Sequence, residues 1–126
     1  MSRYHPGLVQ VPPRDNAAMV RTVGTVTIVD LYSGLIRLHV LHHAAEGPIF
    51  GLGMIEELNR HGYRISPGTL YPLLQGLEKK GYLTSIEQRD GKSLRKIYRA
   101  TPAGRKALSL AKIRVRELFQ ELIEGQ

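Results

Sequence analysis

The sequence predicts a mainly α-helical fold with a small β-hairpin, namely a winged helix-turn-helix that continues into a long C-terminal dimerisation helix. Apolar residues recur at helical spacing in residues 66–80, beside a polar face with a basic end. Two short strand-like runs, 83–88 and 94–100, follow and predict a hairpin. A helical pattern then continues over residues 102–124. A groove-sized helix followed by a basic hairpin is the arrangement of a winged helix-turn-helix.

The length of 126 residues indicates one domain with a modest core. We divide it into an N-terminal arm at residues 1–29, the winged helix-turn-helix at 30–101 and the dimerisation helix at 102–126. Pro6, Pro12 and Pro13 indicate that the arm is partly flexible. A run rich in Val and Thr, residues 20–28, fits a short strand, a helical turn or a partner-docking segment equally well.

Two helices are expected before residue 66. The first begins at Asp30 or Ser33 and ends at Gly47–Pro48. Its expected core-facing stripe is Leu31, Leu35, Leu38, Leu41 and Ala45. The second begins near Gly51, and we expect its inward residues to be Leu52, Ile55 and Leu58 and its outward residues to be Glu56, Glu57 and Arg60.

The third helix, residues 66–80, suits the major groove of a duplex. A polar cap and turn opens it at Ser66–Gly68, and Gly81 follows its end. Its apolar face consists of Leu70, Leu73, Leu74 and Leu77. The opposite side offers hydrogen-bonding groups and ends in a basic pair: Thr69, Tyr71, Pro72, Gln75, Lys79 and Lys80.

The residues Arg89-Asp90-Gly91-Lys92 join the two strand-like runs, and Asp-Gly between alternating segments is a strong hairpin signal. We define residues 89–96 as the basic wing. Lys92, Arg95 and Lys96 lie at or beside its tip, where they can reach phosphates or the minor groove. Successive strand residues point to opposite faces, so Arg89, Arg99 and these cations cannot all face DNA.

Thr101 and Pro102 predict the start of the last helix, because a hydroxyl cap precedes a proline at the first helical position. The helix is too long for a small body to cover. Its apolar seam, spaced alternately by three and four, is Leu108, Ala111, Val115, Leu118 and Leu122. A second stripe that can face the body is Ala103, Ala107 and Leu110. One wide core-facing stripe in a monomer is the alternative, but the length of the seam favours a homodimer.

Positive charge is concentrated in one part of the chain. The formal net charge is +7, and residues 79–116 hold 12 Lys or Arg residues against two acids, Glu87 and Asp90. Such a patch attracts the phosphates of double-stranded DNA and releases counterions on binding. A solvated basic face that only keeps the protein soluble is the plainer interpretation; the neighbouring hairpin and groove-sized helix favour DNA.

Composition excludes several classes of protein. The chain has no Cys, so it has no disulfide, thiolate metal site or thiol nucleophile. No apolar run approaches the roughly 20 residues that span a bilayer, and no signal-peptide pattern is present, so we expect a cytoplasmic protein without membrane contact. Gly51-Leu52-Gly53 lacks the strand and third glycine of a dinucleotide loop. We expect no cofactor and no enzymatic activity.

The histidines of the first helix allow three interpretations. His39 and His43 are one helical turn apart, and such a pair can share a metal ion. Carboxylates are scarce nearby, so a complete site needs Glu46 or the partner copy. A pH-responsive interface is a second interpretation of His39, His42 and His43, and ordinary surface histidines are the third. We predict the third, without a bound metal.

The residues predicted to contact DNA are Arg64, Ser66, Thr69, Tyr71, Pro72, Gln75, Lys79, Lys92, Arg95 and Lys96. Gln75 is the candidate for reading a base edge, since its amide can pair with adenine. Tyr71 is expected to donate its hydroxyl to a phosphate; the alternative is a packed surface aromatic. Ser66 is expected to cap the third helix and to present its N-terminal N–H groups to a phosphate, with Arg64 beside it.

Two segments resemble the PadR family of bacterial transcriptional regulators, GTLYPLLQGLEKKGYL at Gly68–Leu83 and RKIYRATPAGRKAL at Arg95–Leu108. The turn EGPIFG at Glu46–Gly51 is similar to that family as well, and the single C-terminal helix looks like its small subgroup. The resemblance implies a homodimeric repressor of an inverted-repeat operator, often relieved by a small-molecule inducer or an environmental signal. It also implies that Tyr71 contacts DNA. Family members commonly have Tyr at positions 50 and 52, so those hydroxyl groups are absent here.

We therefore expect a sequence-specific DNA-binding transcriptional regulator, a homodimeric repressor that uses recognition helix 66–80 and wing 89–96. The alternative is a winged-helix protein-interaction module that docks a partner through its N-terminal arm and C-terminal helix. The basic wing argues against that as the sole role. A metal- or cofactor-dependent catalyst is a third hypothesis, which elemental analysis would test. The operator, the target genes and the inducer cannot be predicted from the sequence.

Overall fold

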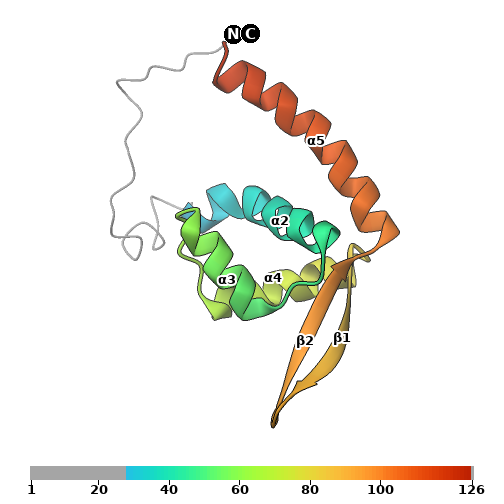
Figure 1. The fold of residues 1–126 in the computed structure, drawn as a ribbon. Helices are drawn as coiled ribbons and strands as arrows, with labels where there is room; N and C mark the ends of the chain where they lie inside the picture. The colour runs from blue at the N-terminus through green and yellow to red at the C-terminus, as the bar shows by residue number, and fades with distance from the viewer. Residues whose placement is uncertain (1–27, 126) are drawn as a thin grey trace. The chain divides into compact units, whose positions relative to one another are not determined.

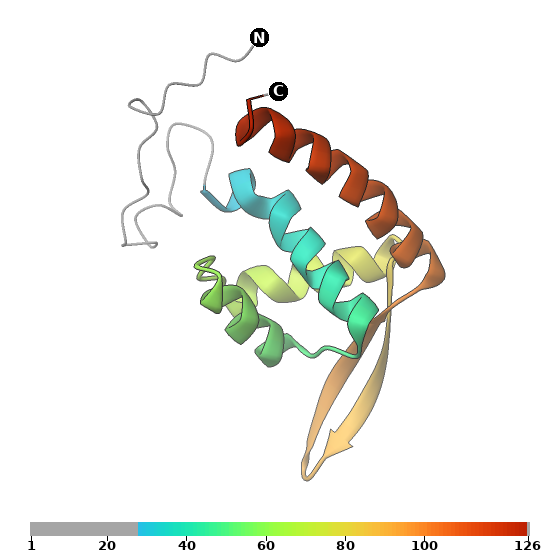
Figure 2. The same cartoon turned by 45° about the horizontal axis from the view of Figure 1, so that its top comes forward.

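A computed structural model describes residues 28–125, which confirm the predicted mainly helical fold with one hairpin (Figures 1 and 2). The element order is α2 (Ile28–Glu46), α3 (Gly51–Arg60), α4 (Pro67–Lys79), β1 (Leu83–Asp90), β2 (Ser93–Ala100) and α5 (Pro102–Leu122). Most of the predicted N-terminal arm lies outside the described residues. The chain divides into two compact units, and residues 34–111 form the one that contains α3, α4 and the hairpin.

The core of residues 34–111 receives side chains from both strands and from each helix in this unit. The largest fully buried side chains are Val40, Leu58, Leu70, Leu74, Leu83 and Tyr98. All four leucines predicted for the apolar face of α4 are buried. The third predicted helix is thus confirmed in position and in orientation, which leaves its polar side facing outward.

Two predicted apolar stripes are wrong in part. In α2, Leu31 and Leu35 are exposed, Leu38 and Ala45 are half-buried, and the buried residues are Ile36, Val40, Leu41 and Ala44. In α3, Leu52 is 63% exposed and Ile55 is half-buried, whereas Met54 is buried beside Leu58. The apolar residues of α2 are distributed around the whole helix, and those of α3 lie on both sides of its core-facing side. Periodicity alone therefore does not decide which face meets the core.

The hairpin is longer than predicted, and its turn is tighter. Leu83 pairs with Ala100 at the base and Asp90 pairs with Ser93 at the tip, so only Gly91 and Lys92 form the turn. Gly91 has a φ of +65°. A two-residue hairpin turn with glycine at its first central position requires such a positive φ.

Contacts at the base of the hairpin hold it against the helices. Ile49, between α2 and α3, exchanges two backbone hydrogen bonds with Tyr98 of β2, at 2.9 and 2.8 Å. The Ser85 hydroxyl in β1 donates to the Glu78 carboxylate in α4 at 2.7 Å. These bonds fix the direction of the hairpin relative to the exposed face of α4.

The start of α5 is confirmed as a capped helix N-terminus. The Gly104 N–H donates to the Thr101 hydroxyl oxygen at 2.9 Å, and that hydroxyl in turn donates to the Gly81 carbonyl. Gly104 and Leu108 are the buried residues of α5. The predicted body-facing stripe is therefore wrong in part: Leu110 is 58% exposed and Ala103 is exposed as well, whereas Ala107 is half-buried.

Candidate nucleic-acid interface

Five of the ten residues predicted to contact DNA lie on α4. Tyr71, Pro72, Gln75 and Lys79 are exposed, and Thr69 is half-buried. They lie opposite the buried leucines because residues one or two positions away from a buried helix position turn toward solvent. The helix therefore presents a continuous polar and basic face.

The N-terminus of α4 differs from the prediction in one bond. Ser66 has the extended backbone of an N-cap, and its carbonyl accepts the N–H groups of Thr69 and Leu70 at 3.1 and 2.9 Å. Its hydroxyl does not cap the helix but donates to the Thr69 hydroxyl at 3.3 Å.

Arg64 has a φ of +52°. A side-chain-bearing residue in this left-handed region stores strain, which recurs in functional turns.

Tyr71 lies against the backbone at the start of α3. A Cβ atom added to Gly51 would lie 2.5 Å from the Tyr71 hydroxyl oxygen and 2.6 Å from its ring carbon Cζ. Tyr71 nevertheless remains 39% exposed. The ring is therefore packed, as the alternative interpretation expected, while part of its surface remains exposed; the predicted phosphate contact stays a prediction.

A groove of about 510 Å³ runs between α4 and β2, and we call it the interface groove. It brings together two predicted residues of the helix, Tyr71 and Gln75, and two of the wing, Arg95 and Lys96. Phe50, Gly51 and Leu52 form its third side. Arg64 and Ser66 line a separate hollow with Asn59 and Ile65. Lys79 and Lys92 are exposed, and with Thr69 and Pro72 they line neither hollow.

Arg95 is held at the edge of the interface groove by two side chains. Its guanidinium carbon lies 4.2 Å from the centre of the Phe50 ring, a cation–π contact. Its Nη1 atom lies 3.9 Å from Oδ2 of Asp90. Sequence reasoning considered Phe50 only for its missing hydroxyl group, and it assigned no role to Asp90 beyond the turn.

Successive side chains along β2 alternate, so the cations of this strand are distributed over the two faces of the hairpin. Alternation places Lys96 on the face of Tyr98 and places Arg95 and Arg99 on the other face, although Arg95 and Lys96 both line the interface groove. Burial, and then the Glu78 carboxylate and Tyr71, raises the pKa of the Tyr98 hydroxyl above its ordinary value. Tyr98 therefore stays neutral at the base of the hairpin.

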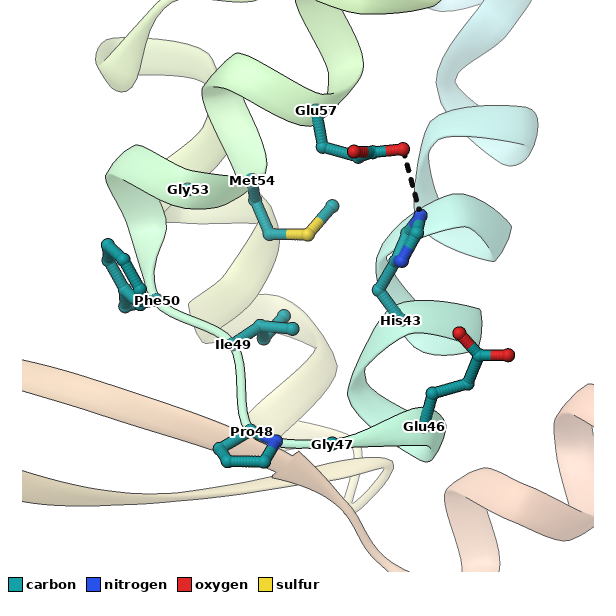
Figure 3. Close-up of a pocket in the computed structure, with 9 residues that line it drawn as sticks. All are labelled: His43, Glu46, Gly47, Pro48, Ile49, Phe50, Gly53, Met54 and Glu57. Atoms are coloured by element: carbon teal, nitrogen blue, oxygen red, sulfur yellow. Dashed lines mark ion pairs between the residues drawn. The ribbon is translucent and has the colours of Figure 1, made fainter.

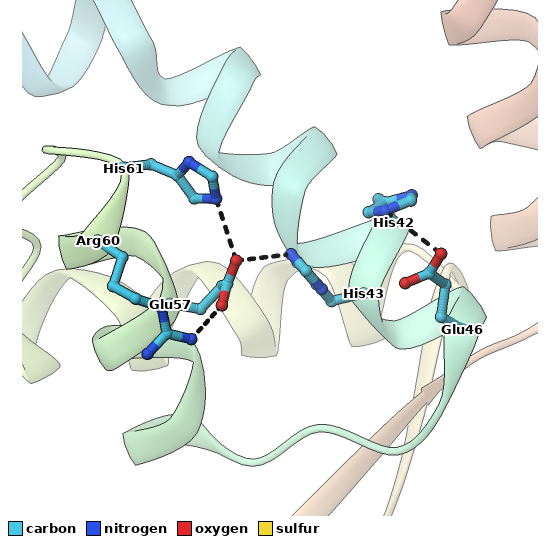
Figure 4. A network of polar contacts seen from close by, with 6 residues as sticks. All are labelled: His42, His43, Glu46, Glu57, Arg60 and His61. Carbon is cyan, nitrogen blue, oxygen red and sulfur yellow. Dashed lines mark hydrogen bonds and ion pairs between the residues drawn. The ribbon is translucent and has the colours of Figure 1, made fainter.

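His43 of α2 and His61, which follows α3, both contact Glu57 (Figure 4). The ring of His42 lies against His43 and that of His39 against His61, and we call these four residues the histidine cluster. Oε2 of Glu57 lies 3.4 Å from His43 Nε2 and 3.0 Å from His61 Nε2, and Arg60 also pairs with this carboxylate. The bonds from Arg60 and His61 lower the pKa of Glu57, which keeps it ionised.

His39 packs against residues that follow α3. Its ring lies against His61, with centroids 4.9 Å apart, and against Tyr63 at 5.3 Å. Burial, followed by the neighbouring His61, His43 and His42, lowers the pKa of His39. The segment that follows α3 therefore supplies the aromatic neighbours of this histidine.

The C-terminal half of α5 is exposed along its apolar residues. Leu118, Phe119 and Leu122 are 49%, 48% and 55% exposed, and Val115 is 43% exposed. Leu108 differs from the rest of the predicted seam because it is already buried within one chain. Among the described residues, no helix is both long and apolar enough to cross a membrane.

Comparison with known proteins gives a consistent family assignment. The model of the transcriptional regulator PadR-like family matches residues 40–110. The transcriptional regulator Rv3488 of Mycobacterium tuberculosis is 54% identical over 93 residues, which are 72% of this chain and 85% of that protein. A PadR family transcriptional regulator from Eggerthella lenta has a similar structure, with a TM-score of 0.67 and 32% identity over 75% of this chain and 84% of its own. A transcriptional regulator from Clostridium thermocellum matches with a TM-score of 0.64 and 28% identity, over 79% and 97% of the two chains.

Proposed function

The chain belongs to the PadR-like family of transcriptional regulators, which are not enzymes, and from this premise we propose that it is a homodimeric repressor that binds an inverted-repeat operator. The observation that carries the proposal is the interface groove, in which the exposed face of α4 meets the basic wing. A helix in the major groove and a wing on the flanking backbone would then contact one duplex together.

The proposed contacts divide into base reading and backbone positioning. Gln75 reads a base edge, because its amide can donate to and accept from adenine in the major groove. Tyr71, Lys79 and Lys92 contact phosphates, which fix the register of the protein on the duplex without reading its sequence. Arg95, held over Phe50, reaches the backbone or the minor groove beside the helix.

A second copy of the chain, in a homodimer, is the simplest partner to cover the exposed apolar residues of α5. Val115, Leu118, Phe119 and Leu122 are each more than two-fifths exposed in a single chain. A large apolar surface on one helix typically marks an interaction site. Because Leu108 is covered within the chain, the proposed seam begins at Ala111. A two-fold dimer would place its recognition helices about one helical turn, ~34 Å, apart.

Selection of bound fragments from the source genome tests this proposal, together with the mass of the protein in sedimentation equilibrium. We expect recovered fragments to share an inverted repeat with half-site centres about 10 base pairs, or a multiple, apart. We expect twice the mass of one chain. Recovery of fragments without a shared motif, or a monomer that binds DNA with full specificity, would contradict the proposal. Loss of the promoter's activity when the protein is added would distinguish repression from activation.

A further inference from the structure

Three side chains of types that can bind a metal ion lie close together at the end of α2. His42, His43 and Glu46 each offer a ligand atom, and these atoms all lie within 4.8 Å of one another. Nε2 of His42 lies 3.6 Å from Oε2 of Glu46 (Figure 4). In a tetrahedral zinc site with bonds of about 2.1 Å, neighbouring ligand atoms are roughly 3.4 Å apart. Small side-chain rotations would therefore bring the three atoms to one ion.

Helix geometry explains why these three residues converge. Glu46 is four residues after His42 and three after His43, and both spacings place side chains on neighbouring positions of one helix face. Glu46 therefore lies between the two imidazoles around the helix axis. His39, which the sequence offered with His43 as one alternative metal-binding pair, is not part of this group, and its ring packs against His61 and Tyr63.

Glu57 lies beside His43, where a carboxylate can hold the imidazole of a metal ligand. It lies 3.4 Å from His43 Nε2 and comes from the neighbouring helix α3 (Figure 3). A neutral imidazole that donates its hydrogen from Nε2 has its lone pair on Nδ1, which can then bind a cation. Metal-bound histidines ordinarily donate the hydrogen of their other nitrogen to a carboxylate or carbonyl group. Arg60 and His61 hold Glu57 in place for this role.

The donors and their exposure indicate the kind of ion. Two imidazoles and a carboxylate suit Zn²⁺ and its first-row neighbours, whereas Mg²⁺ and Ca²⁺ prefer oxygen ligands. The side chains of His42, His43 and Glu46 are 46%, 27% and 66% exposed, so an ion has access and water can complete its coordination. His43 and Glu46 also border a hollow of about 360 Å³ beside Met54 (Figure 3).

We propose that His42, His43 and Glu46 bind one divalent first-row transition-metal ion, with Zn²⁺ as the representative ion. The site itself does not depend on the proposed function. Its effect on regulation does: Glu46 ends α2, and three residues later Ile49 pairs with Tyr98 of the hairpin. An ion at Glu46 would order this connection between α2 and the wing. By linkage, metal and DNA would then change each other's affinity by the same factor.

Calorimetric titration of the full chain, without a histidine tag, with Zn²⁺ alone tests the site. We expect one ion per chain, and at least tenfold weaker binding in His42→Gln and in Glu46→Gln. The matched controls are His39→Gln, in the same histidine cluster, and Glu56→Gln, an exposed carboxylate on α3; both should bind as the wild type does. Co²⁺ should give the intense visible absorption of a tetrahedral site, and excess Mg²⁺ should not displace Zn²⁺.

Several weakly bound ions whose affinity is unchanged in Glu46→Gln would overturn the proposal. Loss of binding in His61→Gln but not in Glu46→Gln would place the ion at Glu57 and overturn the assignment of ligands. A separate DNA titration with and without Zn²⁺ tests the regulatory step. Unchanged DNA affinity in the metal-bound protein would refute that step alone, whereas absence of any DNA binding would refute the proposed function and leave the calorimetric result valid.

Discussion

Replacement of Gly104 by alanine is expected to destabilise the unit formed by residues 34–111. The new Cβ would lie 3.0 Å from the carbonyl carbon of Tyr82 and nearer still to its oxygen. Both are backbone atoms, so no side-chain rotation relieves the overlap, and the start of α5 must move. The same Tyr82 carbonyl accepts the Thr101 N–H at 3.0 Å, and this bond would weaken as well. Overpacking costs about 1–3 kcal/mol and a lost hydrogen bond about 1 kcal/mol, so we expect a loss of about 3 kcal/mol.

Thermal and urea unfolding at a fixed protein concentration measure this effect. A loss of about 3 kcal/mol should lower Tm by roughly 10 °C or more in a domain of this size. Gly76→Ala is the matched control, because a Cβ there meets nothing within 4 Å outside its own helix backbone. Alanine should stabilise the middle of α4 by about 0.5–1 kcal/mol. A Gly104→Ala protein as stable as the wild type would show that α5 does not begin against Tyr82.

Further predictions concern the interface groove and the histidine cluster. Gly51→Ala should displace the Tyr71 ring and weaken operator binding severalfold while Tm changes little; unchanged affinity would exclude a role for this packing. Phe50→Leu removes the cation–π contact of Arg95, worth about 0.5–1 kcal/mol at an exposed site, and should weaken DNA binding by a factor of about 2–5 in gel-shift titrations. The lowered pKa of His39 means that folding favours its neutral form, so metal-free protein should lose stability as pH falls below 6.5. His39→Gln should reduce this loss in Tm measurements from pH 7.5 to 5, and an identical pH profile would contradict the assignment.

Sequence patterns predicted α4 well and α2 poorly, for a physical reason. The leucines of α4 occupy one face, and the other face is polar, so helical period alone orients the helix. Apolar residues surround α2, and the buried set, which includes Ile36 and Val40, is decided by the helices that pack against it. The same limit applies to α5, where Gly104 and Leu108 meet the body although Ala103 and Leu110 fit the pattern equally well.

The candidate site was predicted residue by residue, but its supporting contacts were not. Helical spacing indicated Gln75, and charge indicated the cations of the wing. The packing of Tyr71 on Gly51, and of Arg95 on Phe50, joins segments distant in sequence, so no local spacing reveals it. For the contact of Tyr71, the only local signal was Gly51 at the first position of α3, because glycine does not favour a helix.

The central claim is that α4 reads bases while the wing binds the backbone. Anisotropy titrations of Gln75→Ala and Lys92→Ala against operator and scrambled duplexes, at several salt concentrations, test it most directly. Lys92→Ala should weaken binding to both duplexes alike and reduce the salt slope by about one unit. Gln75→Ala should instead lower the preference for the operator, by about 1–3 kcal/mol, and leave the salt slope unchanged. Equal losses on both duplexes for Gln75→Ala, or a wild-type protein that binds no duplex at low salt, would contradict the account.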